Sequence, residues 1–430
     1  MDKTLEFAGK PYPHWQRRFF TIWSGQAISM LGSQIVSFAV VWYLTEQTGS
    51  ATVLAISSMF SILPNILLSP IAGTLADRSD RKRIMIISDF VVGLARLLGF
   101  FLFLTGVIQV WHIYLMIFIG SAAGAFQHPA MASSTGLMVP KKHLSRVAGM
   151  NQTLYGALSI AAPPLGALLM SLTSIANIFM LDFVTMLVAV LPLLFIPIPQ
   201  PETRRDQNGD AIKHSFFEDI KEGFHYILNW KGLTLLLLSA MLINFLISPA
   251  MSLLPLLVSK HFGGNEVQLA LMNSMLGIGM LIGGLILSVW GGFKRRILTS
   301  FMGLVFSGIS LAVVGFVPST GFSIAVVAFL ISAVMMPLIN GPINAVVQSA
   351  VTPEMQGRVI SMISTAAGFA MPIGLAIAGP VSDAVGIQTW FVIGGIVMSL
   401  AGVFGFISPT MRHIEDQHQV PESIKELRIP

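Results

Sequence analysis

Six ionisable side chains inside long apolar stretches of the sequence or near their ends are candidates for function, because a charge there is costly and is tolerated mainly when it is used or paired. They are Glu46, Asp89, Arg96, His128, Asp182 and Asp383. Carboxylate and imidazole groups in such positions can bind and release protons. Other interpretations stay open, because Glu46 and Asp383 could be interfacial caps, Asp89 could tie down a nearby loop, and His128 could be a packing residue.

Arg96 and Asp182 are predicted to form a buried ion pair. Arg96 lies about twelve residues into its apolar stretch, which is roughly 18 Å at a rise of about 1.5 Å per residue. Asp182 enters from the opposite side and lies about 20 Å from the side where Arg96 enters, in an apolar layer of about 30 Å. The depths agree, and the pair could be purely structural or could respond to protons.

The composition indicates that these residues lie in a membrane protein. The chain has 430 residues, of which 54% are hydrophobic and only 10% charged, whereas soluble domains carry about 25% charged residues. The formal net charge is +5, but the basic residues form short clusters between apolar stretches, which argues against nucleic-acid binding. The absence of cysteine excludes disulfides and thiolate chemistry.

Twelve apolar stretches are long enough to cross a bilayer. Their approximate bounds are 19–44, 51–76, 84–105, 111–137, 148–172, 175–197, 232–259, 267–290, 297–317, 322–347, 359–383 and 388–409. We therefore expect an all-α membrane protein with twelve transmembrane helices. All Lys and Arg residues except Arg96 and Lys260 fall in the N-terminus, the even-numbered loops or the C-terminal tail, which predicts cytoplasmic termini in the inner or plasma membrane.

A short polar segment, residues 73–83, joins the second and third stretches. Gly73 would allow close backbone approach, Asp77 would cap a neighbouring helix, and the basic triplet at its end would lie at an anionic membrane surface. The pattern resembles the loop between helices 2 and 3 of the major facilitator superfamily, which implies a conformational latch; a loop that only sets topology is the alternative. We refer to five residues as the latch: Gly73, Asp77, Arg78, Arg81 and Lys82.

The chain also repeats itself at an offset of about 212 residues, since Pro129 corresponds to Pro342 and Arg146 to Arg358. Two six-helix halves with parallel repeats are the architecture that the resemblance implies. The expected organisation is an N-terminal half at 1–198, a cytoplasmic linker with an amphipathic helix at 199–231, a C-terminal half at 232–410 and a cytoplasmic tail at 411–430.

Four segments narrow the resemblance to the macrolide-efflux branch of drug:proton antiporters. They are residues 20–26, 43–50, 280–285 and 370–375. In addition, Pro163, Pro164 and Gly166 have the spacing of the Gly-Pro-x-x-Gly-Gly antiporter signature, although two of its glycines are alanines here. This departure leaves the close helix packing at that motif as an open question.

The resemblance further implies a substrate cavity built from the first, fourth, seventh and tenth helices. The polar candidates are Gln26, Ser33, Gln34, Gln127, Asn244, Asn340 and Asn344. The aromatic candidates are Phe38, Trp42, Phe126 and Phe245. Apolar walls with a few amides suit a large amphiphilic guest, although the same side chains could instead pack helix against helix.

No phosphate-binding loop of the Walker type and no hydrolase or metalloprotease motif is present in the sequence, so ATP hydrolysis and enzymatic catalysis are not expected and no cofactor is implied. The sequence predicts a proton-coupled exporter of bulky amphiphilic drugs such as macrolides. The expected partners are these drugs, protons and membrane lipid, with a separate partner protein left open. Export of an endogenous metabolite such as a siderophore is the alternative, and a membrane-embedded enzyme or a sensor is a more distant one.

Overall fold

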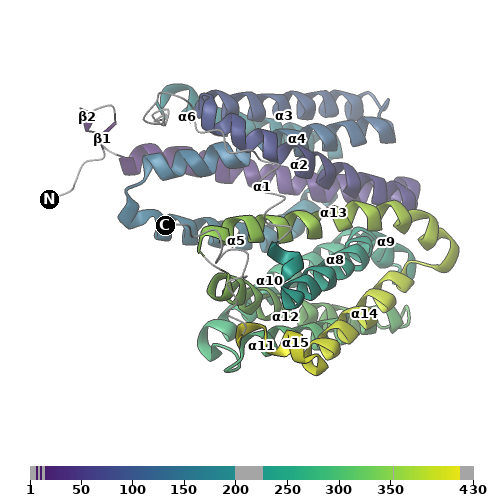
Figure 1. Cartoon of the computed structure of the whole chain (residues 1–430). Coiled ribbons are helices and arrows are strands. Elements are labelled where there is room, and N and C mark those ends of the chain that lie inside the picture. The colour runs from purple at the N-terminus through teal and green to yellow at the C-terminus, as the bar shows by residue number, and fades with distance from the viewer. Residues whose placement is uncertain (1–5, 8–9, 12–14, 199–225, 352, 417–430) are drawn as a thin grey trace. The chain divides into compact units, whose positions relative to one another are not determined.

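The computed structural model describes residues 6–7, 10–11, 15–198, 226–351 and 353–416 (Figure 1). Among these residues, twelve helices are long and apolar enough to cross a membrane, which confirms the predicted fold class. Near the N-terminus, the two-residue strands β1 (Glu6–Phe7) and β2 (Lys10–Pro11) form a small antiparallel pair. The linker expected at residues 199–231, with its amphipathic helix, is described only from residue 226 onward.

The first six spanning helices follow the predicted stretches closely. They are α1 (Trp15–Thr48), α2 (Ala51–Arg78), α3 (Arg81–Leu104), α4 (Val110–Met138), α5 (Leu144–Leu172) and α6 (Ile175–Phe195), with the 3₁₀ turn η1 (Lys141–His143) before α5. Asp80 caps α3, since its side chain accepts a hydrogen bond from the backbone N–H of Arg83 at 3.2 Å. Ser174 caps α6 in the same way through Asn177. Polar caps therefore set the start of these two helices.

The other six spanning helices are α8 (Lys231–Ser252), α10 (Glu266–Trp290), α11 (Arg296–Phe316), α12 (Phe322–Ala350), α13 (Pro353–Val385) and α14 (Gln388–Ile407). The short segments α15 (Pro409–Arg412) and η3 (Ile414–Asp416) follow. The seventh stretch was predicted to run to residue 259, but α8 ends at Ser252. The one-turn α9 (Leu254–Leu256) and the π-helix η2 (Leu257–His261) continue the chain, because Pro255 has no N–H with which to extend the α-helical pattern.

The chain divides into two compact units. Unit 1 comprises residues 1–49 and 56–212, and unit 2 comprises residues 50–55 and 213–430. In unit 1, α6 packs on α1 and α3, α3 packs on α4, and α1 packs on α5. In unit 2, α11 packs on both α12 and α14, α12 on α10, and α8 on α13.

Small residues allow the helices to approach closely. A Cβ atom placed on Gly402 of α14 would lie 2.7 Å from the backbone oxygen of Phe301 in α11. A Cβ atom on Gly99 of α3 would lie 2.5 Å from the ring of Phe179 in α6. Such contacts replace hydrophobic burial as the main source of helix association in lipid.

Candidate functional site

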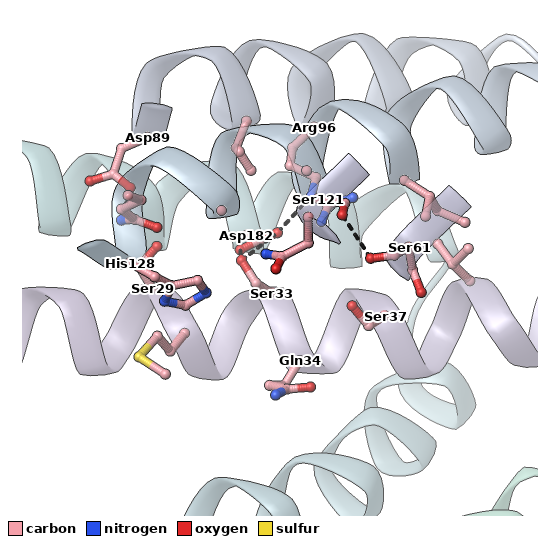
Figure 2. Close-up of a pocket in the computed structure, with 18 of the residues that line it drawn as sticks. Ser29, Ser33, Gln34, Ser37, Ser61, Asp89, Arg96, Ser121, His128 and Asp182 are labelled. Carbon is pink, nitrogen blue, oxygen red and sulfur yellow. Dashed lines mark hydrogen bonds and ion pairs between the residues drawn. The ribbon is translucent and has the colours of Figure 1, made fainter. Parts of the chain in front are cut away.

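Unit 1 contains a polar cavity of about 710 Å³ among its helices. Figure 2 shows the side chains that converge on it, from α1, which crosses the view from left to right, and from α3, α4 and α6. Its lining includes an unusual number of hydroxyl groups: Ser29, Ser33, Ser37, Ser57, Ser58, Ser61, Ser121 and Tyr155. A cavity with this lining can hold water or a hydroxylated ligand inside the apolar layer.

The predicted pair of Arg96 and Asp182 is present in this cavity. Arg96 Nε lies 2.9 Å from Asp182 Oδ2, and the two side chains are 10% and 2% exposed. The Nε–H is not aligned for a hydrogen bond to any described residue, so the contact is an electrostatic one. Ser33 donates to Asp182 Oδ1 at 3.1 Å, and this bond and the ion pair are visible in Figure 2.

Asp89 lies in a second polar cluster on the same cavity. Gln26 Nε2 donates to Asp89 Oδ2 at 2.8 Å, and Gln127 Nε2 donates both to Asp89 Oδ1 and to Gln26 Oε1, the latter at 2.9 Å. The three residues come from α3, α1 and α4, so one closed ring of hydrogen bonds joins three helices. Gln26 and Gln127, two of the polar candidates for the substrate cavity, line this cavity of unit 1.

The remaining ionisable candidates fall into two groups. His128 lines the same cavity as Asp89 and Asp182, and all three side chains are labelled in Figure 2. Glu46 and Asp383 are exposed near the ends of α1 and α13. Asp383 accepts a hydrogen bond from the Thr52 hydroxyl at 3.2 Å within unit 2.

The basic part of the latch contacts neighbouring helices. Arg81 is 6% exposed and donates from Nη1 to the backbone oxygen of Ser133 in α4 at 3.1 Å. Lys82 donates from Nζ to the backbone oxygen of Leu194 in the last turn of α6 at 3.0 Å, where a cation is favourable. A Cβ atom on Gly73 would meet no described heavy atom within 4 Å, so the expected close approach at Gly73 is not found. The side chains of Asp77 and Arg78 lie outside the described residues.

The antiporter-like motif packs tightly despite its two alanines. Pro163 and Pro164 lie within α5. Gly166, one turn of helix further on, is buried against α1, where a Cβ atom would lie 2.7 Å from the Phe38 ring. Close packing of α5 on α1 is therefore retained at this position.

The aromatic residues that were predicted on the first and fourth helices do not line the cavity of unit 1. Phe38 and Trp42 are 7% and 2% exposed, and Phe126 is half-buried; none of the three lines that cavity. Gln34, another of the polar candidates, lines it together with Gln26 and Gln127. The reason is that α1 is apolar on several faces, and its bulky aromatic rings fill the contacts with neighbouring helices rather than the cavity.

Unit 2 contains a smaller cavity of about 350 Å³, which is mostly apolar and includes four methionines in its lining. Asn244 and Asn340 line it, but Asn344 and Phe245 do not. The amides of Asn244 and Asn340 donate to backbone oxygens of their own helices, at 2.8 and 3.1 Å. Phe245 instead lies where the α8 backbone meets Gly374 of α13.

The sequence prediction missed most of the hydroxyl groups around the cavity of unit 1. Ser29, Ser33 and Ser37 follow one another at intervals of four along α1, and that spacing places them on one helix face. Serines and Asn65 on α2 complete the lining, although α2 was not among the helices expected there. A search for hydroxyl groups at helical spacing in the first two stretches would have found both groups.

A family model described as "Major Facilitator Superfamily" matches residues 22–375 and 233–428. The chain belongs to the Major Facilitator Superfamily. Macrolide efflux protein A of Streptococcus pyogenes is 34% identical over 391 residues, which cover 90% of this chain and 95% of that protein. The Multidrug efflux pump Tap of Mycolicibacterium fortuitum is 25% identical over 397 residues, with 89% and 94% covered. The resemblance to the macrolide-efflux branch of the superfamily is thus confirmed, and the chain is a multi-pass membrane protein.

Solved structures show the same superfamily fold. A bacterial homologue of the iron transporter ferroportin in its inward-facing state has a TM-score of 0.71 and 16% identity, covering 90% of this chain and 98% of that one. A bacterial homologue of the lysosomal transporter Spinster has a TM-score of 0.65 and 14% identity, with 95% and 98% covered. At these identities the likeness concerns the fold alone.

Proposed function

We propose that this Major Facilitator Superfamily member is a secondary active exporter that moves bulky amphiphilic drugs, macrolides in particular, out of the cell in exchange for protons. The observation that carries the proposal is the 34% identity to Macrolide efflux protein A over 90% of the chain. The polar cavity of unit 1 supports it, because that cavity contains two buried carboxylates and a histidine in the apolar layer. Such groups are retained in membranes chiefly where they serve transport or pair with one another.

The orientation that we propose places both termini in the cytoplasm and the latch at the inner membrane surface. The chain has no cysteine, so single cysteines can be introduced at Val107 and Lys294, exposed residues of loops on opposite sides of the predicted membrane. A membrane-impermeant maleimide added to intact cells should label Val107→Cys and should not label Lys294→Cys. The reverse pattern would contradict the orientation.

The experiment that tests export and its energy source measures accumulation of radiolabelled erythromycin in cells that express the protein. Expression should lower accumulation relative to the empty vector, and a protonophore should abolish the difference while cellular ATP is held constant. Uphill export that persists with the proton gradient dissipated would exclude proton coupling. Unchanged accumulation on expression would refute macrolide export and would favour an endogenous metabolite as the substrate.

A further inference from the structure

Three hydrogen bonds close a ring between Asp89, Gln26 and Gln127 and connect α3, α1 and α4. Asp89 is 6% and Gln26 is 7% exposed. Each carboxylate oxygen of Asp89 accepts from a different glutamine, and the two glutamines are bonded to one another. The ring therefore depends on the carboxylate acting as a double acceptor.

The two buried carboxylates of this cavity differ in their charge compensation. Asp182 has the guanidinium of Arg96 at 2.9 Å, whereas Asp89 contacts no cation among the described residues and is held by two neutral amides. Other helices that line the cavity contribute three titratable groups near Asp89: Asp182 from α6, His128 from α4 and Tyr155 from α5. Its own helix, α3, contributes Arg81 and Arg96. The side chains that α1 and α2 contribute to the cavity are all neutral. A buried carboxylate without a cation is expensive to keep charged.

We propose that Asp89 is the proton-binding carboxylate of the exchange cycle, and that the proton acts by opening the Asp89–Gln26–Gln127 ring. This inference rests on the proposed proton coupling. A protonated carboxyl oxygen becomes an O–H donor and a much weaker acceptor for an amide N–H. If the amide facing it turns to offer its oxygen, that amide loses its bond to the other glutamine. At least one of the three bonds is lost or weakened, whichever oxygen takes the proton.

Loss of the hydrogen-bond ring would remove a restraint on α4 next to Pro129, where this helix bends most easily. Pro129 lies two residues beyond Gln127 inside α4 and removes one backbone hydrogen bond of that helix. On the far side of Pro129, the backbone oxygen of Ser133 is held by Arg81 at 3.1 Å. The helix α3 therefore clamps α4 on both sides of the proline, through Asp89 on one side and through a latch residue on the other. Protonation releases one clamp and leaves the other, so α4 can bend at Pro129 while it stays attached to the latch.

The second half of the repeat contains a proline that corresponds to Pro129 but no ionisable side chain that corresponds to Asp89. Pro342 in α12 corresponds to Pro129, and Asn340 corresponds to Gln127. The helix α11 carries no ionisable side chain after Arg296, and Asn340 bonds to the backbone of its own helix at Met336 instead. The ring is thus a feature of unit 1, as a proton site confined to one half requires.

The deciding experiment measures proton release from purified protein in weakly buffered detergent when erythromycin is added. The wild-type protein should release protons, Asp89→Asn should release none, and Asp89→Glu should restore release. Asp182→Asn should still release protons, even where its transport is reduced. Erythromycin binding and the elution profile in size-exclusion chromatography are measured for each variant, so that a misfolded protein is recognised.

The outcomes separate this inference from the proposed function. Proton release that survives in Asp89→Asn and is lost in Asp182→Asn would overturn the assignment of Asp89 and leave proton coupling intact. Wild-type protein that binds erythromycin without releasing protons would refute both. If erythromycin does not bind, proton release is measured on addition of the cationic dye ethidium instead. The results for the wild-type, Asp89→Asn and Asp182→Asn proteins are then interpreted in the same way.

A second experiment tests whether α4 bends, by measuring a distance between α3 and α4. Spin labels are attached to cysteines introduced at Leu94 of α3 and Phe118 of α4, which are both exposed. They report the distance between these helices on the side of Pro129 that is opposite the latch. The wild-type distance distribution should change between alkaline and acidic buffer, and the Asp89→Asn protein should show the acidic distribution in both. If the distance distribution responds to pH equally in the wild-type and Asp89→Asn proteins, Asp89 does not control the bending of α4, and the proposal is wrong. Pro129→Ala should retain proton release and lose the change in distance.

Discussion

Arg96 of α3 and Asp182 of α6 face one another inside the apolar layer, with Nε and Oδ2 2.9 Å apart and both side chains almost fully buried. Ser33 and Thr185 donate further hydrogen bonds to the same carboxylate. The Arg96 guanidinium also lies 5.8 Å from the centre of the Phe179 ring, a cation–π distance. The pair therefore links α3, α6 and α1, and each of its charges is compensated only while the other is present.

The first prediction is that removing one member of this pair is more damaging than removing both. Arg96→Met and Asp182→Asn should each lower the stability of the purified protein by about 3–5 kcal/mol, because an uncompensated charge stays buried. The double variant should recover much of that loss. Thermal unfolding in detergent, followed by the fluorescence of intrinsic tryptophan, gives the measurement.

Arg83 provides the control for this prediction. It lies 3.5 Å from Asp80 with its side chain 82% exposed, and exposed pairs contribute only about 0–1 kcal/mol. Arg83→Met should therefore leave the unfolding temperature almost unchanged. If the double variant of the buried pair is as unstable as the worse single variant, the two charges do not stabilise each other.

The second prediction concerns the contact between Gly166 of α5 and Phe38 of α1. Gly166→Ala should destabilise the protein by about 1–3 kcal/mol, because the added methyl group overlaps the Phe38 ring. Adding Phe38→Leu should relieve part of this strain. Gly136→Ala is the matched control, since a Cβ atom on Gly136 of α4 meets no described atom within 4 Å. If Gly166→Ala leaves the stability unchanged, the Phe38 ring moves aside easily.

The sequence was sufficient to predict the depth of buried charges but not the direction of side chains. Counting residues from each membrane face gave the same depth for Arg96 and Asp182, because helical rise and bilayer thickness are nearly constant. The hydropathy pattern carries no such information about Phe38 and Trp42. A helix that is apolar around its whole circumference does not reveal which face is packed and which lines a cavity.

The ring around Asp89 illustrates a second limit. Gln26 and Gln127 were selected as cavity residues and Asp89 as a coupling candidate, each on the properties of its own helix. Their hydrogen bonds span sequence separations of 63, 101 and 38 residues. Spacing within one helix cannot predict contacts between helices, so only the structure shows that the three residues form one group.

The third prediction tests whether the polar cavity of unit 1 receives the substrate. Ser37 is exposed to that cavity, and Ser37→Trp should fill much of a volume of about 710 Å³. Erythromycin resistance conferred by the protein should be lost, with its amount in the membrane unchanged. Ile28→Trp is the control, because Ile28 is exposed on the same helix and does not line the cavity. Full resistance in Ser37→Trp would place macrolide binding elsewhere.

The last prediction concerns Glu415, which the sequence assigned to a cytoplasmic tail. Its Oε1 accepts a hydrogen bond of 2.7 Å from the backbone N–H of Ile297, at the start of α11 and 118 residues away. The N-cap residue of α11, Arg295, makes no side-chain capping bond, so Glu415 caps α11 in its place. Carboxylates at helix N-termini are favourable because they meet unpaired N–H groups and the positive end of the helix dipole.

Glu415→Ala should therefore lower stability by about 1 kcal/mol, and Glu415→Gln by less, since the amide oxygen can still accept the bond. The unfolding temperature of purified protein in detergent is the measure. Truncation after His413 should lower it relative to truncation after Asp416, because the shorter protein lacks Glu415 and also the buried Ile414 side chain. Equal stability of the two truncated proteins would show that neither the Glu415 carboxylate nor the Ile414 side chain contributes to holding α11.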